Sequence, residues 1–188
     1  MVMSALLAAR LLARESDGMG ADELARFNAL PLAAARTQLL ACCKSAAWAD
    51  RMAAGRPYSS AKDAVRQSSA IMSMLTVADL EAALAGHPRI GERPEGSEQS
   101  AQWSRSEQSA AATADDQTRR ELAESNDEYE HRFGHVYLVS ASGRSAADLL
   151  RLLRKRLTNS RQAEWQVVRA ELQKINEIRL VKMLASTR

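Results

Sequence analysis

The sequence predicts an all-α protein, a compact single-domain bundle of several helices. Alanine, leucine, arginine and glutamate, which favour helices, dominate the 188 residues. Aromatic residues make up only 4% of the chain and runs of β-branched residues are nearly absent, so few segments suit a sheet. The length is typical of one domain that buries a substantial core.

The charge and the cysteines narrow the class of protein. The formal net charge is +3, and basic residues are interspersed with acidic ones except in the short run from Arg151 to Arg156. Nucleic-acid-binding proteins usually cluster lysine and arginine on one face, so we expect no nucleic-acid partner. No apolar run reaches the ~20 residues of a membrane span. Cys42 and Cys43 are adjacent, the wrong spacing for a CxxC motif, and we interpret them as reduced thiols of a cytoplasmic protein.

The helices follow in order from apolar periodicity and from their start signals. Pro31 suits a first helical turn, and Ser59 or Ser60 suits an N-cap. Two capping boxes, Thr76 to Asp79 and Ser145 to Asp148, place an acidic residue three positions after a hydroxyl. We expect helices near 22–28, 32–41, 45–54, 60–73, 77–85, 98–111, 114–131, 146–157 and 161–184.

Two loops interrupt the predicted bundle. Residues 91–97 (GERPEGS) form the longest polar break, and residues 133–143 (FGHVYLVSASG) are the only strand-like run. Residues 1–20 are expected to form an N-terminal extension, a short helix or loose tail, ahead of a helical domain over 21–188. Because binding and catalytic groups concentrate on loops, a site is expected at the two breaks.

The segment AGHPRIGERP (85–94) leads into the first break, and it contains one of only three histidines. Gly86 is a typical helix-stopping residue, and a residue before proline is pushed into an extended backbone. His87 is therefore expected on a stiff turn past a helix end. Imidazole exchanges protons near neutral pH, which suits a catalytic role. The alternative is a helix-end histidine that caps carbonyl groups.

A polar cluster follows within the helix expected at 98–111. Ser104 lies three residues before Glu107 and four before Gln108, so the three side chains share one face. They form either part of a site or a solvated polar stripe.

The last helix carries a charged residue on its apolar stripe. Trp165, Val168, Leu172 and Ile175 step by three and four residues, and the next position on this stripe is Arg179. An arginine on a core face is costly unless it meets an anion. Arg179 is therefore either a clamp for a ligand carboxylate or a salt-bridged residue at the edge of the bundle.

Two histidines four residues apart raise a metal-site alternative. His131 and His135, with Glu128 and Glu130 nearby, have the spacing of zinc ligands on one helical face. Gly134 lies between the histidines and weakens the helix that this geometry needs, so we expect no metal site.

Taken together, the motifs resemble the 2-oxo-4-hydroxy-4-carboxy-5-ureidoimidazoline (OHCU) decarboxylase family. The resemblance rests on GHPRIGE, SxxEQ, FGHVYLVSASGRS and LxKINEIRL in this order, with FNALP at the start, and it spans Phe27 to Leu184. It implies an all-α, cofactor-free enzyme, commonly a homodimer, that converts OHCU to (S)-allantoin in the last step of urate degradation. Urate oxidase and hydroxyisourate hydrolase would supply the substrate.

The resemblance also assigns roles to individual residues. It implies that His87 is the principal catalytic residue, that Glu107 is a second one, and that Pro88 shapes the pocket. The other implied contacts bind substrate: Ser104, Gln108, Arg179, and the backbone of His135, Val136, Tyr137, Leu138 and Val139. No metal is implied.

Two other functions stay open at this point. One is a metal-dependent amidohydrolase that acts on a ureide with His87, His131 and His135. The other is a non-enzymatic helical adaptor that binds an acidic partner through the basic stretch 144–156.

Overall fold

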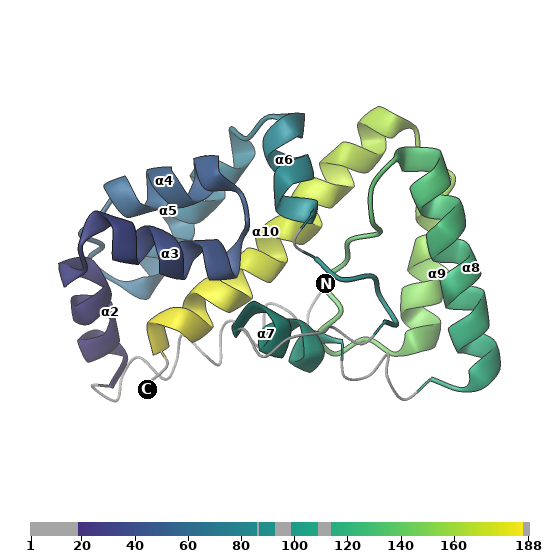
Figure 1. The fold of residues 1–188 in the computed structure, drawn as a ribbon, viewed down its shortest axis with the longest axis horizontal. Coiled ribbons are helices and arrows are strands. Elements are labelled where there is room, and N and C mark those ends of the chain that lie inside the picture. Colours follow the sequence, from purple (N-terminus) through teal and green to yellow (C-terminus); the bar gives the residue numbers. More distant parts are fainter. Residues whose placement is uncertain (1–18, 86, 93–98, 109–113, 186–188) are drawn as a thin grey trace. The chain divides into compact units, whose positions relative to one another are not determined.

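The computed structural model describes residues 19–85, 87–92, 99–108 and 114–185, and within these ranges every regular element is a helix (Figure 1). The helices are α2 (Met19–Ala29), α3 (Leu32–Cys42), α4 (Ala46–Ala54), α5 (Ala61–Ser73), α6 (Val77–Leu84), α7 (Gln99–Glu107), α8 (Asp116–Phe133), α9 (Ala146–Arg156) and α10 (Arg161–Ala185). The all-α prediction is confirmed, and each of these helices lies where one was expected. Residues 98 and 109–111 of the expected seventh helix, and most of 1–20, lie outside the described residues.

The predicted start signals act as expected. Thr76 and Asp79 form a reciprocal capping box, in which each side chain accepts a hydrogen bond from the other residue's backbone N–H, at 3.2 and 2.9 Å. The Ser145 hydroxyl accepts from the N–H of Asp148 at 3.1 Å, and the Ser60 hydroxyl caps α5. Local side-chain chemistry therefore sets where these helices begin.

The chain forms two compact units, and it passes from one to the other at the end of α6 and again within α10. The first comprises residues up to Ala83 and from Gln173 onward, and the second comprises Leu84–Leu172. In the first unit α3 packs against α4, and α4 against α5. Its buried side chains include Leu39, Trp48, Met52, Met72, Leu80, Val181 and Leu184.

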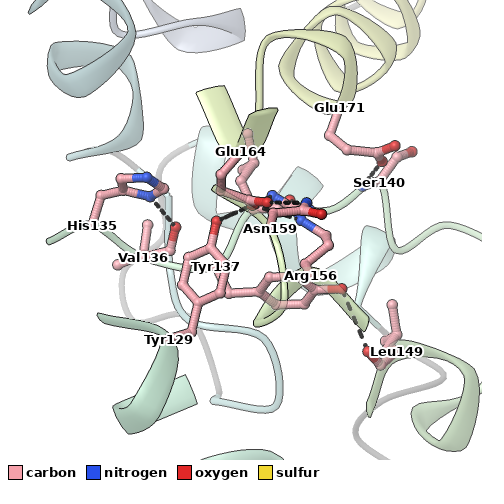
Figure 2. Close-up of polar contacts among 11 residues, drawn as sticks. Tyr129, His135, Val136, Tyr137, Ser140, Leu149, Arg156, Asn159, Glu164 and Glu171 are labelled. Atoms are coloured by element: carbon pink, nitrogen blue, oxygen red, sulfur yellow. Dashed lines mark hydrogen bonds and ion pairs between the residues drawn. The ribbon is translucent and has the colours of Figure 1, made fainter. Parts of the chain in front are cut away.

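In the second unit α8 packs against α9. The buried cluster there is formed by Ile90, Leu122, Tyr129, Phe133, Tyr137, Val139, Ala141, Leu149, Leu150 and Leu153. A buried ion pair joins Arg156, the last residue of α9, to Glu164 in the first turns of α10. The carboxylate of Glu164 also accepts hydrogen bonds from the Tyr129 hydroxyl and the Asn159 amide (Figure 2).

The strand-like interpretation of residues 133–143 is wrong, because residues 135–140 are irregular. Side chains, and not a neighbouring strand, bind the backbone of this segment. Arg156 donates to the carbonyl of Leu138. The N–H of Ser140 donates to Glu171 Oε2 at 2.8 Å (Figure 2). Buried backbone groups need partners, and here buried charged residues supply them. No helix in the described part of the chain is long and apolar enough to cross a membrane.

Candidate active site

The loop that carries His87 begins directly at the end of α6. The backbone N–H of His87 donates to the carbonyl of Leu84 at 2.9 Å, which continues the last turn of the helix. His87 and Pro88 are half-buried, and the Nε2 atom of the imidazole is shielded from solvent. Gly86, the expected helix stop, lies outside the described residues. The backbone of His87 is therefore held by a hydrogen bond to the buried end of α6.

Arg89 fastens this loop to α8. Its Nε and Nη2 donate to the two carboxylate oxygens of Glu130 at 2.7 and 2.6 Å, and its Nη1 lies 2.9 Å from Asp127 Oδ1. The hydrogen bonds from Arg89 to Glu130 raise the pKa of Arg89 further above its ordinary value, so the guanidinium stays charged. A bidentate contact of this kind fixes the orientation of the guanidinium and also pairs its charge with that of the carboxylate.

Two further contacts hold the residues that follow. The buried amide of Asn126 on α8 donates to the carbonyl of Ile90 at 3.0 Å. The backbone N–H of Gly91 donates to Gln108 Oε1 at 3.1 Å. Gly91 has φ of +92°, and a Cβ at this position would lie 2.9 Å from Leu122 Cδ2. Only glycine suits this turn, because the backbone is left-handed and α8 lies too close for a side chain.

The face predicted for α7 is buried. Ser104, Glu107 and Gln108 are at most 9% exposed, whereas the neighbouring Gln102 and Ser106 are exposed. The solvated-stripe alternative is therefore wrong. Oε1 of Gln108 accepts from the backbone N–H of Gly91, which fixes the orientation of the Gln108 amide. The structure thus joins the SxxEQ motif to the His87 loop directly.

Residues 135–139 are fixed by aromatic packing and by Arg156. The His135 ring lies against Trp165, with ring centres 4.4 Å apart, and against Tyr129 at 5.5 Å, while its Nδ1 lies 3.1 Å from the Val136 carbonyl. Tyr137, Leu138 and Val139 are buried. The His135 side chain therefore packs against aromatic rings of α8 and α10.

The histidine pair does not have the geometry that the metal-site alternative requires. Helix α8 ends at Phe133, and Gly134 caps it with φ of +80°, so His135 lies beyond the helix. His131 is exposed on the last turn, and the carboxylate of Glu130 is engaged by Arg89. Across the described ranges, no three histidine, cysteine, aspartate or glutamate residues are grouped as a metal site would require.

Arg179 is buried, as its place on the apolar stripe predicted, and is only 3% exposed. Its Nη1 donates to the carbonyl of Cys42 at 3.4 Å, within the first unit. The other predicted site residues all belong to the second unit: His87, Pro88, Ser104, Glu107, Gln108 and 135–139.

The basic stretch 144–156 makes contacts within its own unit. Arg144 donates to the carbonyl of Ser140, and the remaining arginines bind carboxylates, in the pairs Arg151–Asp148, Arg154–Glu121 and Arg156–Glu164. Sequence reasoning missed the structural role of Arg156, since the run RLLRKR looks uniformly basic and its partner lies on the next helix. These pairings weaken the adaptor hypothesis.

Comparisons with known proteins support the family resemblance. A family model described as OHCU decarboxylase matches residues 28–181. The chain is 34% identical over 147 residues to the uric acid degradation bifunctional protein TTL of Arabidopsis thaliana, a match that covers 77% of this chain and 45% of that protein. It is 31% identical over 140 residues to the uric acid degradation bifunctional protein PucL of Bacillus subtilis, covering 72% of this chain and 27% of that protein. The chain thus spans less than half the length of these two curated relatives.

Solved structures show the same fold. The crystal structure of an OHCU decarboxylase in the presence of (S)-allantoin superposes with a TM-score of 0.69 at 29% identity, over 78% of this chain and 96% of that one. A crystal structure of (S)-allantoin synthase gives a TM-score of 0.63 at 15% identity, over 85% of this chain and 53% of that one. The second likeness concerns the fold alone.

Proposed function

Because the chain belongs to the OHCU decarboxylase family, we propose that it catalyses the cofactor-free, stereoselective decarboxylation of OHCU to (S)-allantoin. The observation that carries the proposal is the anchored His87 loop. Arg89 binds α8, and Gly91 binds Gln108 at the end of α7, so the histidine and the buried SxxEQ face belong to one connected assembly. A catalytic group held this firmly is suited to proton transfer in a fixed geometry.

The chemistry of the substrate explains why no cofactor is required. Loss of carbon dioxide breaks the bond between a ring carbon and its carboxyl group, and the electron pair moves toward the adjacent ring C=N bond. The ring nitrogen gains a proton and the hydroxyl group loses one, so an enolate results. The neighbouring carbon of the enolate is then protonated on one face, which gives (S)-allantoin. The substrate therefore provides its own electron sink, and the protein supplies orientation and proton transfer.

Each predicted residue has a place in this reaction. We assign to His87 the acceptance of the hydroxyl proton as carbon dioxide departs. Glu107 would orient His87 or the substrate nitrogens, while Ser104 and Gln108 would fix the ring. Arg179 would bind an anionic oxygen through its planar fork, and the backbone of residues 135–139 would contact the ring.

The proposal extends to the setting of the enzyme. We propose a homodimer that works after urate oxidase and hydroxyisourate hydrolase, whose products lead to OHCU. Cys42 and Cys43 are buried and form no disulfide, which supports a reducing, cytoplasmic environment.

A coupled assay tests the proposal. Urate, urate oxidase and hydroxyisourate hydrolase generate fresh OHCU, and the circular dichroism of the product is followed with and without this protein. With the protein present, we expect faster formation of a single enantiomer of allantoin. Without it, OHCU should decay slowly to racemic allantoin. An unchanged rate together with a racemic product would refute the proposal.

A further inference from the structure

Asn176 on α10 is a buried side chain whose polar atoms are not satisfied. It is 1% exposed, and among the residues that the structure describes neither Oδ1 nor Nδ2 has a hydrogen-bond partner. Buried polar groups in proteins are nearly always paired, since an unpaired one loses its hydration without compensation. Leucine has the same branched shape and the same number of side-chain heavy atoms, and it would carry no such cost. The asparagine therefore implies a partner from outside this part of the chain.

The position of Asn176 relates it to Arg179. The two residues are three positions apart on α10, so they share one face of the helix. Leu172 and Ile175, on the same stripe, are buried and apolar. Asn176 and Arg179 are thus two polar groups placed side by side on a surface that is otherwise built for packing.

Asn126 shows how a purely structural asparagine looks in this protein. It is 2% exposed, and its Nδ2 donates to the carbonyl of Ile90 at 3.0 Å, while its Oδ1 has no hydrogen-bond partner among the described residues. Its role is to hold a loop. Neither end of the Asn176 amide performs a comparable function.

We propose that Asn176 is a specificity-determining residue that binds the ureide portion of the substrate next to Arg179. A primary amide presents donor and acceptor groups in a single plane. This arrangement is complementary to an edge with adjacent N–H and C=O groups, which both an imidazolinone ring and a urea possess. Arg179 would take the anionic oxygen, and Asn176 would recognise the neutral amide edge. The inference rests on the proposed function and adds a residue to its site.

The test compares Asn176→Leu with the wild-type protein in two measurements. Because the substitution removes an unsatisfied buried amide, the melting temperature of the ligand-free variant should be equal to or higher than that of the wild-type protein. The same change should raise KM for OHCU, and the dissociation constant for (S)-allantoin by calorimetry, by about tenfold, since up to two hydrogen bonds are lost. Because this contact is expected to be equally strong in the bound substrate and in the transition state, kcat should change less than KM. Asn126→Leu is the matched control and should lower the melting temperature, because the carbonyl of Ile90 loses its donor.

The opposite pattern would overturn the inference. If Asn176→Leu melts at a lower temperature and keeps the wild-type KM and allantoin affinity, Asn176 is a structural residue. Should the leucine variant fail to fold, Asn176→Ala removes the amide without adding bulk, and the same ligand measurements decide. A wild-type protein that does not accelerate OHCU decay would refute the proposed function instead, and allantoin calorimetry on the variants would still decide whether Asn176 binds a ureide.

Discussion

Substitution of Gly91 by alanine should shift the loop that carries His87. The Gly91 backbone has φ of +92°, and the new Cβ would lie 2.9 Å from Leu122 Cδ2 and 3.7 Å from Leu122 Cγ. Leu122 is 1% exposed and belongs to the buried cluster of the second unit, so it has little room to yield. The loop must therefore move away from α8, and the hydrogen bond from Gly91 to Gln108 should weaken.

The size of the effect follows from two costs. A left-handed conformation costs a residue with a Cβ roughly 1–2 kcal/mol. Overpacking against a buried side chain adds about 1–3 kcal/mol. For a chain of this length each kcal/mol corresponds to a change of about 2–4 °C in Tm, so Gly91→Ala should lower Tm by roughly 10 °C. Gly134 is a matched control, because its φ is +80° and an added Cβ would meet no atom within 4 Å, so Gly134→Ala should lower Tm by only about 4–5 °C.

Thermal melting followed by circular dichroism measures the difference, and the coupled assay measures kcat. We expect Gly91→Ala to lose kcat as well as stability, and Leu122→Ala to relieve part of the added cost in a double-mutant cycle. Equal losses of Tm in Gly91→Ala and Gly134→Ala would refute the role of the close contact with Leu122. An unchanged kcat in a destabilised Gly91→Ala protein would refute the role of the loop in positioning His87.

Three further outcomes are expected. Arg156→Met leaves the fully buried carboxylate of Glu164 without its cation and should lower the free energy of unfolding in urea by about 3–5 kcal/mol; a loss below about 1 kcal/mol would contradict this. Burial raises the pKa of the Cys43 thiol from 9.0 to about 11, so this thiol ionises at a lower pH in the unfolded protein than in the folded one. The contribution of Cys43 to the free energy of unfolding is therefore fully present below pH 9. It falls by about 1.4 kcal/mol per pH unit as the pH rises toward 11. Cys43→Ala should flatten this decline, and an identical pH profile would disprove its origin. Arg179→Lys keeps the charge but loses the planar fork, so KM for OHCU should rise about tenfold with little change in Tm, and an unchanged KM would exclude the clamp.

Local sequence signals predicted much of the fold. Capping boxes at Thr76 and Ser145 set helix starts, because the stabilising contact lies within one turn. The three-and-four spacing around Arg179 predicted a buried arginine, and the spacing of Ser104 and Glu107 predicted a shared face. Each of these features depends only on neighbours along one helix.

Contacts between distant residues could not be predicted in the same way. The sequence places Glu130 beside His131, yet its carboxylate binds Arg89, which lies 41 positions earlier. The apolar run after Phe133 has the composition of a strand, but the buried charges of Arg156 and Glu171 bind its backbone instead. Periodicity reports which face of an element is buried and does not report which partner covers it.

The most direct test of the proposed catalysis is the stereochemical assay on His87→Gln. Glutamine retains hydrogen-bonding groups but cannot accept a proton near neutral pH, and the loop position of His87 means that little core is lost. With OHCU supplied by urate oxidase and hydroxyisourate hydrolase, we predict that the variant keeps its helical circular dichroism and Tm, while the rate and the optical activity of the allantoin fall to those of the uncatalysed reaction. Turnover near the wild-type rate, with (S)-allantoin still formed in excess, would show that His87 is not the catalytic residue.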